Sequence, residues 1–375
     1  MVDKFGAGGF HPYHGQTGSY AGEWSAHQQP QRRAHEFIFG VPALKTESVD
    51  PASSGFVPRA ECPSTRRLVF TYAFDMEYFL GLDGGGTKTE CVLMDRAGRI
   101  ISRSFSGPSN PSRIGVESAV LEIVKAGELA LIQGGVARNA VVALCAGMAG
   151  TGNAAMKERV LRDLQSAFPE MTVQVITDLE AALGAAGEGA VIVLVAGTGS
   201  AAIGRDAQGQ IWRAGGQGPR TGDDGSAYDI GSRAVTRAMK EREGKGTDSS
   251  LGIKILTQLG YSSWPELQRR AAEEPDAVFP LAFPVVAAAA DAGDADAREI
   301  LLQAAQELSS LVSTVAEHMG YSRQSILIAK TGGTVGRSAF FDAQLDAALM
   351  QALPLAEIGG LAMSPAEAAA RIALK

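Results

Sequence analysis

From Tyr78 onward, short apolar runs alternate along the chain with stretches in which apolar residues recur every three or four positions. Runs of the first kind predict buried strands, and the second period predicts helices. The predicted strands are 78–82, 90–94, 141–145, 173–177, 190–196, 201–204 and 325–329. The predicted helices are 118–133, 154–168, 179–186, 251–259, 264–273, 283–292, 294–319 and 365–373. This order predicts an α/β fold of two domains with a cleft between them.

Two windows of the chain can be superposed at an offset of 111 residues. One reads Gly86-Thr-Lys-Thr89 and continues to Asp95, Gly98 and Ile100; the other reads Gly197-Thr-Gly-Ser200 and continues to Asp206, Gly209 and Ile211. Each window follows an apolar strand and leads into a second strand, a turn with Asp and Gly, and a third strand. The pattern predicts a duplicated unit built around a Gly-Thr hairpin.

The two hairpins have the composition of anion-binding loops. Glycine lets backbone N–H groups converge without a Cβ in the way, and threonine and serine hydroxyls add donors. Ordinary β-hairpins also use Gly and Thr, but two matched loops in register favour a polyphosphate gripped between two domains. A Walker A loop is excluded, because Gly81-x4-Gly86 is followed by Thr87 before Lys88. No G-x-G-x-x-G stands between a strand and a helix either.

Composition narrows the class of protein. The formal net charge is −7 and glycine is abundant, with 45 of 375 residues. The acidic balance argues against a nucleic-acid or anionic-membrane surface. Three cysteines are too few for a disulfide framework, and the start lacks the apolar core of a signal peptide, so a cytoplasmic protein is expected. Cys91 and Cys145 lie in predicted strands and are interpreted as core residues.

Residues 1–75 differ in composition from the rest. They contain four of the five histidines and show neither helical nor strand period. His11 and His14 have the spacing of a metal pair, but a tail with scattered histidines explains them as well. We predict a disordered extension over 1–75, one domain over 76–187 and a second over 188–375, with the last helix able to return to the first domain.

Three segments carry a resemblance to a known superfamily. Asp83-Gly-Gly-Gly-Thr-Lys-Thr89 resembles the first phosphate motif of the superfamily of acetate and sugar kinases, heat-shock chaperones and actin. Ala196-Gly-Thr-Gly-Ser200 resembles its second phosphate motif, and Lys330-Thr-Gly-Gly-Thr-Val-Gly336 its adenosine motif. The nearest likeness is to N-acetylglucosamine kinase and the BadF/BadG-type ATPases. It implies two ribonuclease-H-like (actin-like ATPase) domains with an interdomain cleft.

The resemblance also implies roles for particular residues. The ATP-binding set is Gly85, Gly86, Thr87, Lys88, Thr198, Gly199, Gly332 and Gly333. The sugar-binding set is Asn110, Ser200, Gly216 and Asp223. Asp83 is the implied Mg²⁺ carboxylate, and Asp178 the implied general base, 20 residues before Thr198. Each has a structural alternative: Asp178 as a helix N-cap, Asp83, Asn110 and Asp223 as turn residues, and Lys88 as a solvated strand residue.

The leading hypothesis is an ATP- and Mg²⁺-dependent kinase that phosphorylates the 6-hydroxyl of N-acetylglucosamine or glucosamine. Ala201 and the stretch from Gln217 to Arg220 depart from the acetyl-sugar kinases and leave the sugar open. The alternative is a BadF-type ATPase that activates a dehydratase or reductase through an iron–sulfur cluster. A sugar-sensing regulator is less favoured, because no helix-turn-helix or basic patch is found. The partner is a small molecule, and a homodimer stays open.

Overall fold

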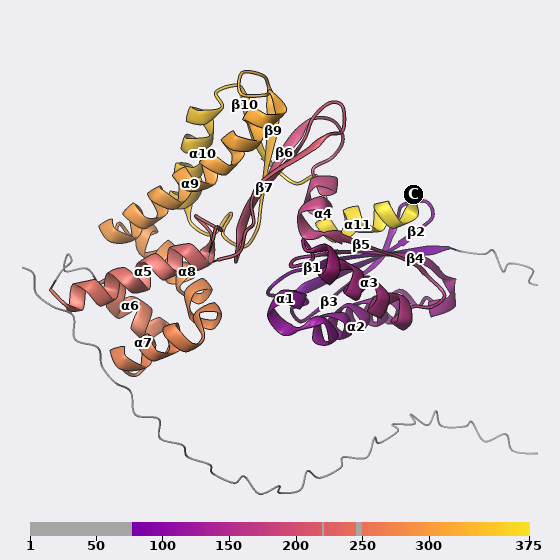
Figure 1. Ribbon diagram of the computed structural model, residues 1–375, viewed down its shortest axis with the longest axis horizontal. Coiled ribbons are helices and arrows are strands. Elements are labelled where there is room, and N and C mark those ends of the chain that lie inside the picture. Colours follow the sequence, from indigo (N-terminus) through magenta and orange to yellow (C-terminus); the bar gives the residue numbers. More distant parts are fainter. Residues whose placement is uncertain (1–76, 220, 245–249) are drawn as a thin grey trace, which may run out of the picture. The chain divides into compact units, whose positions relative to one another are not determined.

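The computed structural model describes residues 77–219, 221–244 and 250–375. The predictions made for residues 1–75, including the histidine pair and Cys62, lie outside this part of the chain. The described residues form two mixed β-sheets of five strands each, with helices packed on both (Figure 1).

The first sheet has the strand order β3-β2-β1-β4-β5. Its strands are β1 Tyr78–Gly84, β2 Thr89–Asp95, β3 Ile100–Ser106, β4 Val141–Met148 and β5 Thr172–Thr177. β1, β2 and β3 pair antiparallel, whereas β4 pairs parallel with both β1 and β5. The carboxyl ends of β1, β4 and β5 therefore meet at one edge of the sheet.

The second sheet repeats this arrangement. Its strands are β6 Val191–Ala196, β7 Ser200–Arg205, β8 Ile211–Gly215, β9 Ile326–Thr331 and β10 Ala356–Gly360. β6, β7 and β8 pair antiparallel, and β9 pairs parallel with both β6 and β10. Read from β8, the order β8-β7-β6-β9-β10 matches that of the first sheet element by element. The duplication predicted from the two Gly-Thr windows is confirmed.

Every predicted helix is present in the described residues, but three further helices, Pro111–Ile114, Ala227–Arg242 and Ala339–Ala352, were not predicted. The helices are α1 Pro111–Ile114, α2 Val116–Gly134, α3 Ala154–Ala167, α4 Asp178–Ala185, α5 Ala227–Arg242, α6 Leu251–Gln258, α7 Trp264–Glu273, α8 Pro275–Asp291, α9 Ala295–Met319, α10 Ala339–Ala352 and α11 Pro365–Leu374, with a 3₁₀ turn at Arg138–Ala140. The predicted start of α8 at residue 283 was wrong, because the helix runs through Pro280 and Pro284. A proline removes one backbone hydrogen bond, and here burial of the surrounding apolar residues outweighs that loss.

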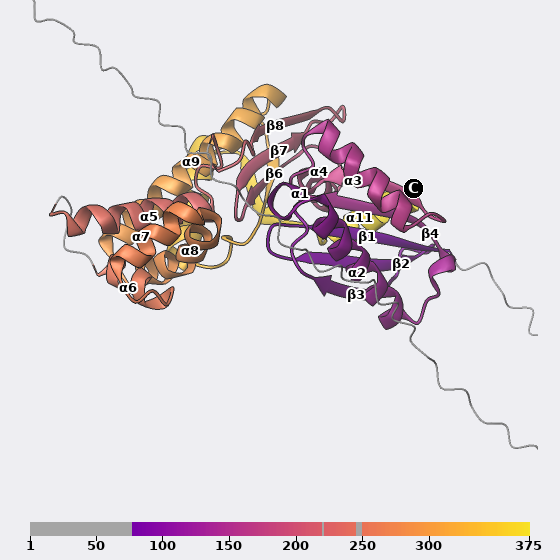
Figure 2. The ribbon, with the colours of Figure 1, turned by 60° about the horizontal axis from the view of Figure 1, so that its bottom comes forward.

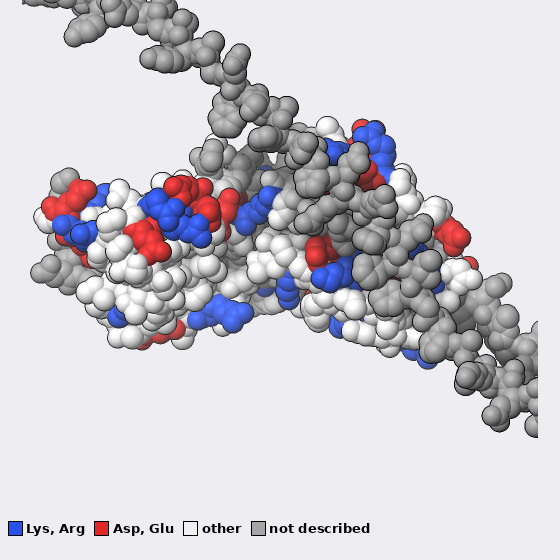
Figure 3. Space-filling view, turned by 90° about the horizontal axis from the view of Figure 1, so that it is seen from below, with Lys and Arg blue, Asp and Glu red and all other residues white. Residues whose placement is uncertain are grey.

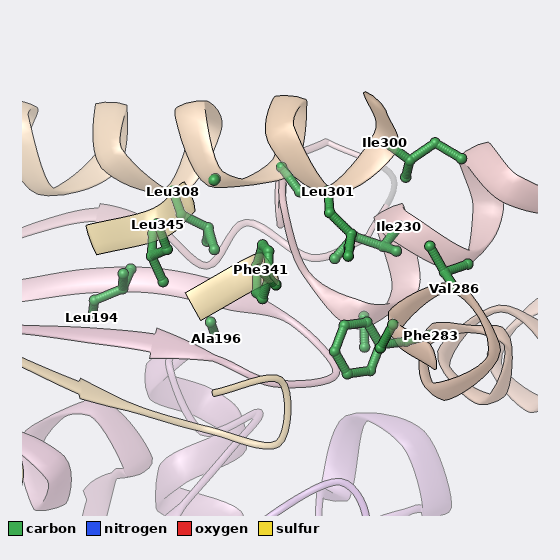
Figure 4. Packing of buried hydrophobic residues seen from close by; sticks show 14 of the residues in the cluster. Leu194, Ala196, Ile230, Phe283, Val286, Ile300, Leu301, Leu308, Phe341 and Leu345 are labelled. Carbon is green, nitrogen blue, oxygen red and sulfur yellow. The ribbon is translucent and has the colours of Figure 1, made fainter. Parts of the chain in front are cut away.

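The largest core joins the second sheet to the helices that follow it. Leu194 and Ala196 of β6 lie against Phe283 of α8, Leu308 of α9 and Phe341 of α10, all buried (Figure 4). Figures 1 and 2 both show α5 to α8 grouped together. Among the described residues no single helix has the length and hydropathy of a membrane span. Helices α8 and α9 meet the length and hydropathy criteria only when taken together, and this pair is bent by 113°.

The last helix packs on the first sheet rather than the second. α11 lies beside β1, β2 and β4 and against α4 (Figure 1). Its backbone comes so close to β1 that a Cβ at Gly81 would lie 2.0 Å from the backbone nitrogen of Ala370. Only glycine fits at that position, and the chain end is thereby tied to the strand that leads to Asp83.

Charged side chains of both signs lie on the described surface. On the face in Figure 3, basic and acidic side chains are intermixed. Representative ion pairs are Arg233 with Asp229 at 2.9 Å and with Glu307 at 2.7 Å. Such pairing cancels local fields.

Candidate active site

Two carboxylates lie at the edge of the first sheet where the parallel strands end. Asp83 is the sixth residue of β1, and Asp178 directly follows β5. β4 lies between those strands, so their backbones are about 10 Å apart, or two strand spacings. The first hairpin loop, in which the Gly85 N–H donates to the Lys88 carbonyl at 3.0 Å, starts directly after β1. The sheet therefore brings a glycine loop and two acids together.

The second hairpin lies beside the loop that resembles an adenosine motif. The Gly197 N–H donates to the Gly199 carbonyl at 2.9 Å and closes the turn. Thr334 donates to the Ala196 carbonyl through both its hydroxyl, at 2.7 Å, and its N–H, at 3.0 Å. Gly332 has φ +114°, and a Cβ there would meet the same carbonyl at 2.2 Å. The two loops thus form one backbone surface.

A pocket of about 980 Å³ joins the two halves of the described chain. Nine residues singled out by the resemblance line it: Gly85, Gly86, Asn110, Asp178, Thr198, Gly199, Ser200, Gly216 and Asp223. Five others do not: Asp83, Thr87, Lys88, Gly332 and Gly333. The predicted sugar residues and base are therefore gathered in one cavity with parts of both phosphate loops.

Asp178 is not the cap of helix α4. Thr177 is the N-cap: its hydroxyl accepts the Glu180 N–H at 3.1 Å, and Glu180 accepts the Thr177 N–H at 2.7 Å. This is a capping box, and the Thr-Asp-Leu-Glu stretch carries its signature in the sequence. The reading of Asp178 as an N-cap was wrong. Asp178 lines the pocket. Burial raises the pKa of its carboxyl group, and hydrogen bonds from the Leu179 and Asp178 N–H groups oppose that rise.

Asp83 is partly buried and lies near the negative charge of Asp178. The pKa of Asp83 is raised from 3.8 to about 7, mainly by burial and secondly by the charge of Asp178. Two carboxylates held near each other in a poorly solvated site fit a divalent cation, which would relieve both effects. No group of three or more metal-ligating side chains is found in the described ranges.

Asp223 has a backbone conformation that is uncommon for residues other than glycine. It is the non-glycine residue with positive φ, +60°, in the described part of the chain, and it is buried. Its carboxylate accepts the N–H groups of Ser200 and Gly218, and burial raises its pKa. The Ser200 hydroxyl donates to the Asp224 carbonyl at 2.7 Å. The strained loop is thus tied to the second hairpin, which aims Asp223 at the pocket.

Asn110 has the turn role that the sequence allowed. Its Oδ1 accepts the Ser112 N–H at 3.0 Å and caps the single turn of α1. A cap occupies only the oxygen, and Asn110 also lines the pocket, so its amide NH₂ group stays available to a ligand.

Lys88 points away from the pocket. Its Nζ lies 5.3 Å from the centre of the Phe105 ring on β3, and the residue is exposed. The alternative reading as a solvated strand residue fits this position better than a phosphate contact does.

Sequence reasoning missed two pocket arginines and one acid. The Arg113 Nη2 lies 2.8 Å from the Asp276 Oδ1, so α1 is joined to the start of α8. The Arg213 Nη2 donates to the Gly216 carbonyl at 2.7 Å. All three residues line the pocket. Their local sequence contains no motif, because what unites them is a contact between distant segments.

Both described cysteines are core residues, as predicted. Cys91 and Cys145 are fully buried in β2 and β4. Burial raises the pKa of the Cys145 thiol to about 12, so it is neutral at ordinary pH.

Comparison with known proteins shows which family the chain belongs to. The model of the BadF/BadG/BcrA/BcrD ATPase family matches residues 80–361. An N-acetylmuramic acid/N-acetylglucosamine kinase from Clostridium acetobutylicum is 31% identical over 270 residues, 69% of this chain and 86% of the relative. An N-acetyl-D-glucosamine kinase from Dictyostelium discoideum is 27% identical over 316 residues, 80% of this chain and 98% of the relative.

Solved structures share the fold. A provisionally assigned N-acetylglucosamine kinase from Chromobacterium violaceum superposes with a TM-score of 0.67 at 23% identity, covering 80% of this chain and all of that one, 100%. A ROK family glucokinase from Streptomyces griseus, in complex with glucose and AMPPNP, gives 0.53 at 17% identity, covering 79% and 99%. The expected fold of two actin-like ATPase domains is confirmed. On its motifs, its duplicated sheets and a family match that spans most of its length, the chain belongs to the BadF/BadG/BcrA/BcrD ATPase family.

Proposed function

We propose that the chain is an amino-sugar kinase that transfers the γ-phosphoryl group of ATP to the 6-hydroxyl of N-acetylglucosamine or glucosamine. The observation that carries the proposal is the position of Asp178. It lines the pocket together with glycines of both hairpins, and helix α4 is capped by Thr177, through the capping box with Glu180, rather than by Asp178. The names of the relatives from Clostridium and Dictyostelium support an amino sugar as acceptor.

In this proposal Asp178 accepts the proton of the attacking hydroxyl. A general base works best when its pKa is near the operating pH. Burial raises the pKa of Asp178 in that direction, while a hydrogen bond from the Leu179 N–H and the charge of Arg213 oppose the rise. The rate should therefore fall as the pH is lowered through the raised pKa.

Asp223 and Asn110 are proposed to hold the sugar. A sugar needs acceptors and donors for several hydroxyls, and a buried carboxylate and an amide supply them. The fixed, positive-φ loop of Asp223 limits how far the ring can turn, so the hydroxyl that reaches Asp178 is selected by position.

Mg²⁺ would be held by Asp83, directly or through water, together with the phosphates of ATP. Bound there, it would neutralise charge on the phosphate oxygens. The backbone N–H groups of the two hairpins would bind the remaining phosphate oxygens. The adenosine would lie on the loop of Gly332 and Gly333, which is in contact with the second hairpin.

The iron–sulfur activator is the weaker reading. A cluster shared between subunits needs thiolates at a surface, and Cys91 and Cys145 are fully buried in strands. The described part of the chain therefore offers no accessible thiolate. An absorption spectrum of anaerobically purified protein without a band near 400 nm would agree with the kinase.

The decisive experiment has two stages. Coupled ADP-release assays against a panel of amino sugars and hexoses identify the acceptor, and phosphorus–proton correlation spectra of the product locate the phosphate. Asp178→Asn is then compared with Asp224→Asn, which changes an exposed carboxylate next to Asp223 that does not line the pocket. Removing the base should lower kcat by about 10²–10⁴-fold, with Asp224→Asn within threefold of wild type. A kcat for Asp178→Asn within threefold of wild type would exclude it as the base.

A further inference from the structure

Phosphoryl transfer needs positive charge near the moving group, and the pocket supplies little of it. Of the described residues that line the pocket, Arg113 and Arg213 are the two basic ones. Lys88, in the first phosphate motif, lies over Phe105 on the outside. Donors aimed at charge that develops in the transition state are among the largest contributions to catalysis. The question is which arginine is free to act.

Arg213 is engaged with its own loop. Its Nη2 donates to the Gly216 carbonyl at 2.7 Å and its Nε to the Gly215 carbonyl at 3.4 Å. It also lowers the pKa of Asp178 through its charge. These contacts make it a support of the glycine loop and of the ionised state of the base.

Arg113 lies over the first phosphate hairpin. Its Nη1 is 3.4 Å, and its Cδ 4.0 Å, from the point where a Cβ would stand on Gly86. Its charge also lowers the pKa of Asp223. The guanidinium therefore lies beside a loop that is expected to bind phosphate. It also lines the same pocket as Asp223, the carboxylate that is expected to bind sugar.

The present partner of Arg113 can be exchanged. Asp276 contacts it through one ion pair of 2.8 Å, and the Asp276 side chain is 58% exposed. Ion pairs with such an exposed partner contribute little, because water solvates both charges almost as well. A phosphate is a stronger partner, since its oxygens match the planar fork of a guanidinium.

We propose that Arg113 leaves Asp276 when ATP binds and stabilises the γ-phosphoryl group during its transfer. The inference rests on the proposed kinase function. In the step, the sugar hydroxyl oxygen forms a bond to the γ-phosphorus, the bond from that phosphorus to the β,γ-bridging oxygen breaks, and ADP leaves with the electron pair. The hydroxyl proton goes to Asp178. Arg113 donates to the equatorial phosphoryl oxygens and takes no proton.

A nucleotide-binding comparison tests the contact without turnover. Affinities for ADP and for the non-hydrolysable analogue AMPPNP are measured by calorimetry with Mg²⁺ on wild type, Arg113→Gln and Arg162→Gln. Arg162 on α3 forms an exposed pair with Glu158, with exposed fractions of 65% and 68%, and serves as the matched control. Loss of a charged hydrogen bond to the γ-phosphate should weaken AMPPNP binding to Arg113→Gln about tenfold to hundredfold and leave ADP within twofold. The control should change neither.

Kinetics give the second readout. Arg113→Gln should lower kcat on the best neutral amino sugar by about 10²-fold, with partial recovery in Arg113→Lys, which restores the charge but not the fork. Melting temperatures of both variants report whether they fold, and Arg113→Lys carries the test if the glutamine variant does not.

Three outcomes would overturn the proposal. One is equal weakening of ADP and AMPPNP, and another is a kcat within threefold of wild type. The third is a loss of activity in Arg113→Gln that is confined to a carboxylated sugar such as N-acetylmuramic acid. That result would mean that Arg113 binds an acidic substituent of the acceptor. If wild type phosphorylates no amino sugar, the proposed function fails, and the comparison of ADP with AMPPNP still decides whether Arg113 contacts a γ-phosphate.

Discussion

Replacing Asp83 with asparagine should stabilise the protein, and only at neutral and alkaline pH. Burial and the charge of Asp178 raise the pKa of Asp83 from 3.8 to about 7 in the folded state. In the unfolded chain the carboxyl returns to its ordinary pKa. Between these values the folded state binds more protons than the unfolded state, so the free energy of unfolding falls as the pH rises from about 4 to about 7.

The magnitude follows from the size of that shift. One pKa unit corresponds to about 1.36 kcal/mol, so a rise of about three units costs the ionised protein about 4 kcal/mol above pH 7. Water that reaches this partly exposed side chain makes the figure an upper value. Asparagine has nearly the same shape and never ionises, so Asp83→Asn should recover most of this free energy. At roughly 2–4 °C per kcal/mol, the melting temperature should rise by roughly 5–10 °C at pH 8.

The assay is thermal and urea unfolding of wild type and Asp83→Asn from pH 4 to pH 8, without nucleotide or divalent cation. The two proteins should agree near pH 4 and separate progressively up to about pH 7. Asp95→Asn on the neighbouring strand is a control of opposite sign. Hydrogen bonds from the Arg99 and Ala97 backbone and the Arg99 side chain lower the pKa of Asp95, so that variant should lose stability above the ordinary carboxyl pKa and approach wild type in acid.

A difference between Asp83→Asn and wild type that is the same at pH 4 and pH 8 would refute the reasoning, because a shape effect does not titrate. Destabilisation at pH 8 would refute it as well. The variant should also lose its response to Mg²⁺ in turnover, since the carboxylate proposed to hold the cation is gone. Carboxylates placed to bind a cation commonly destabilise the protein when they are ionised and no cation is bound.

Two further expectations concern the hairpins and the boundary at Met76. Gly86→Val and Gly197→Val should raise the KM for ATP, measured in the coupled assay, with little change in melting temperature. A Cβ at Gly86 would have only the flexible Arg113 side chain nearby, at 3.4 Å, and a Cβ at Gly197 would lie 3.5 Å from the Gly333 nitrogen. Unchanged ATP affinity in both variants would refute the prediction that these loops bind phosphate. A chain that begins at Met76 should keep full activity, because the described cores form within residues 77–375; a loss of more than tenfold would place part of the enzyme upstream.

The strands and their duplication could be predicted because the signal is local. Buried strands need runs of apolar residues, and the Gly-Thr turns repeat at a fixed offset, so both the first and the second sheet are visible in the sequence. Helices α1 and α5 were not predicted. Helix α10 and strand β10 were missed as well. The apolar residues of α10 are spread around the helix, and β10 is a short edge strand with two glycines, Gly359 and Gly360. Neither has the period that marks an element from sequence.

Some residues of the candidate site could also be predicted from local sequence, and others could not. The glycine loops, Asp83 and Asp178 could be found because the chemistry of each is written in consecutive residues at the end of a strand, and the Thr177–Glu180 capping box was also readable there. Arg113, Arg213 and Asp276 come from three separate segments and meet only in the pocket. The outward position of Lys88 was likewise decided by its contact with Phe105.

The sequence by itself determined the repeated motif, the strands that support it and the residue types able to bind phosphate, because these depend on neighbours along the chain. Only the tertiary structure decided which side chains share the pocket and which pKa values are raised. Burial and Coulomb interaction depend on distance in space, and segments far apart in the sequence, such as α1 and α8, approach each other only after the two sheets and their helices have packed.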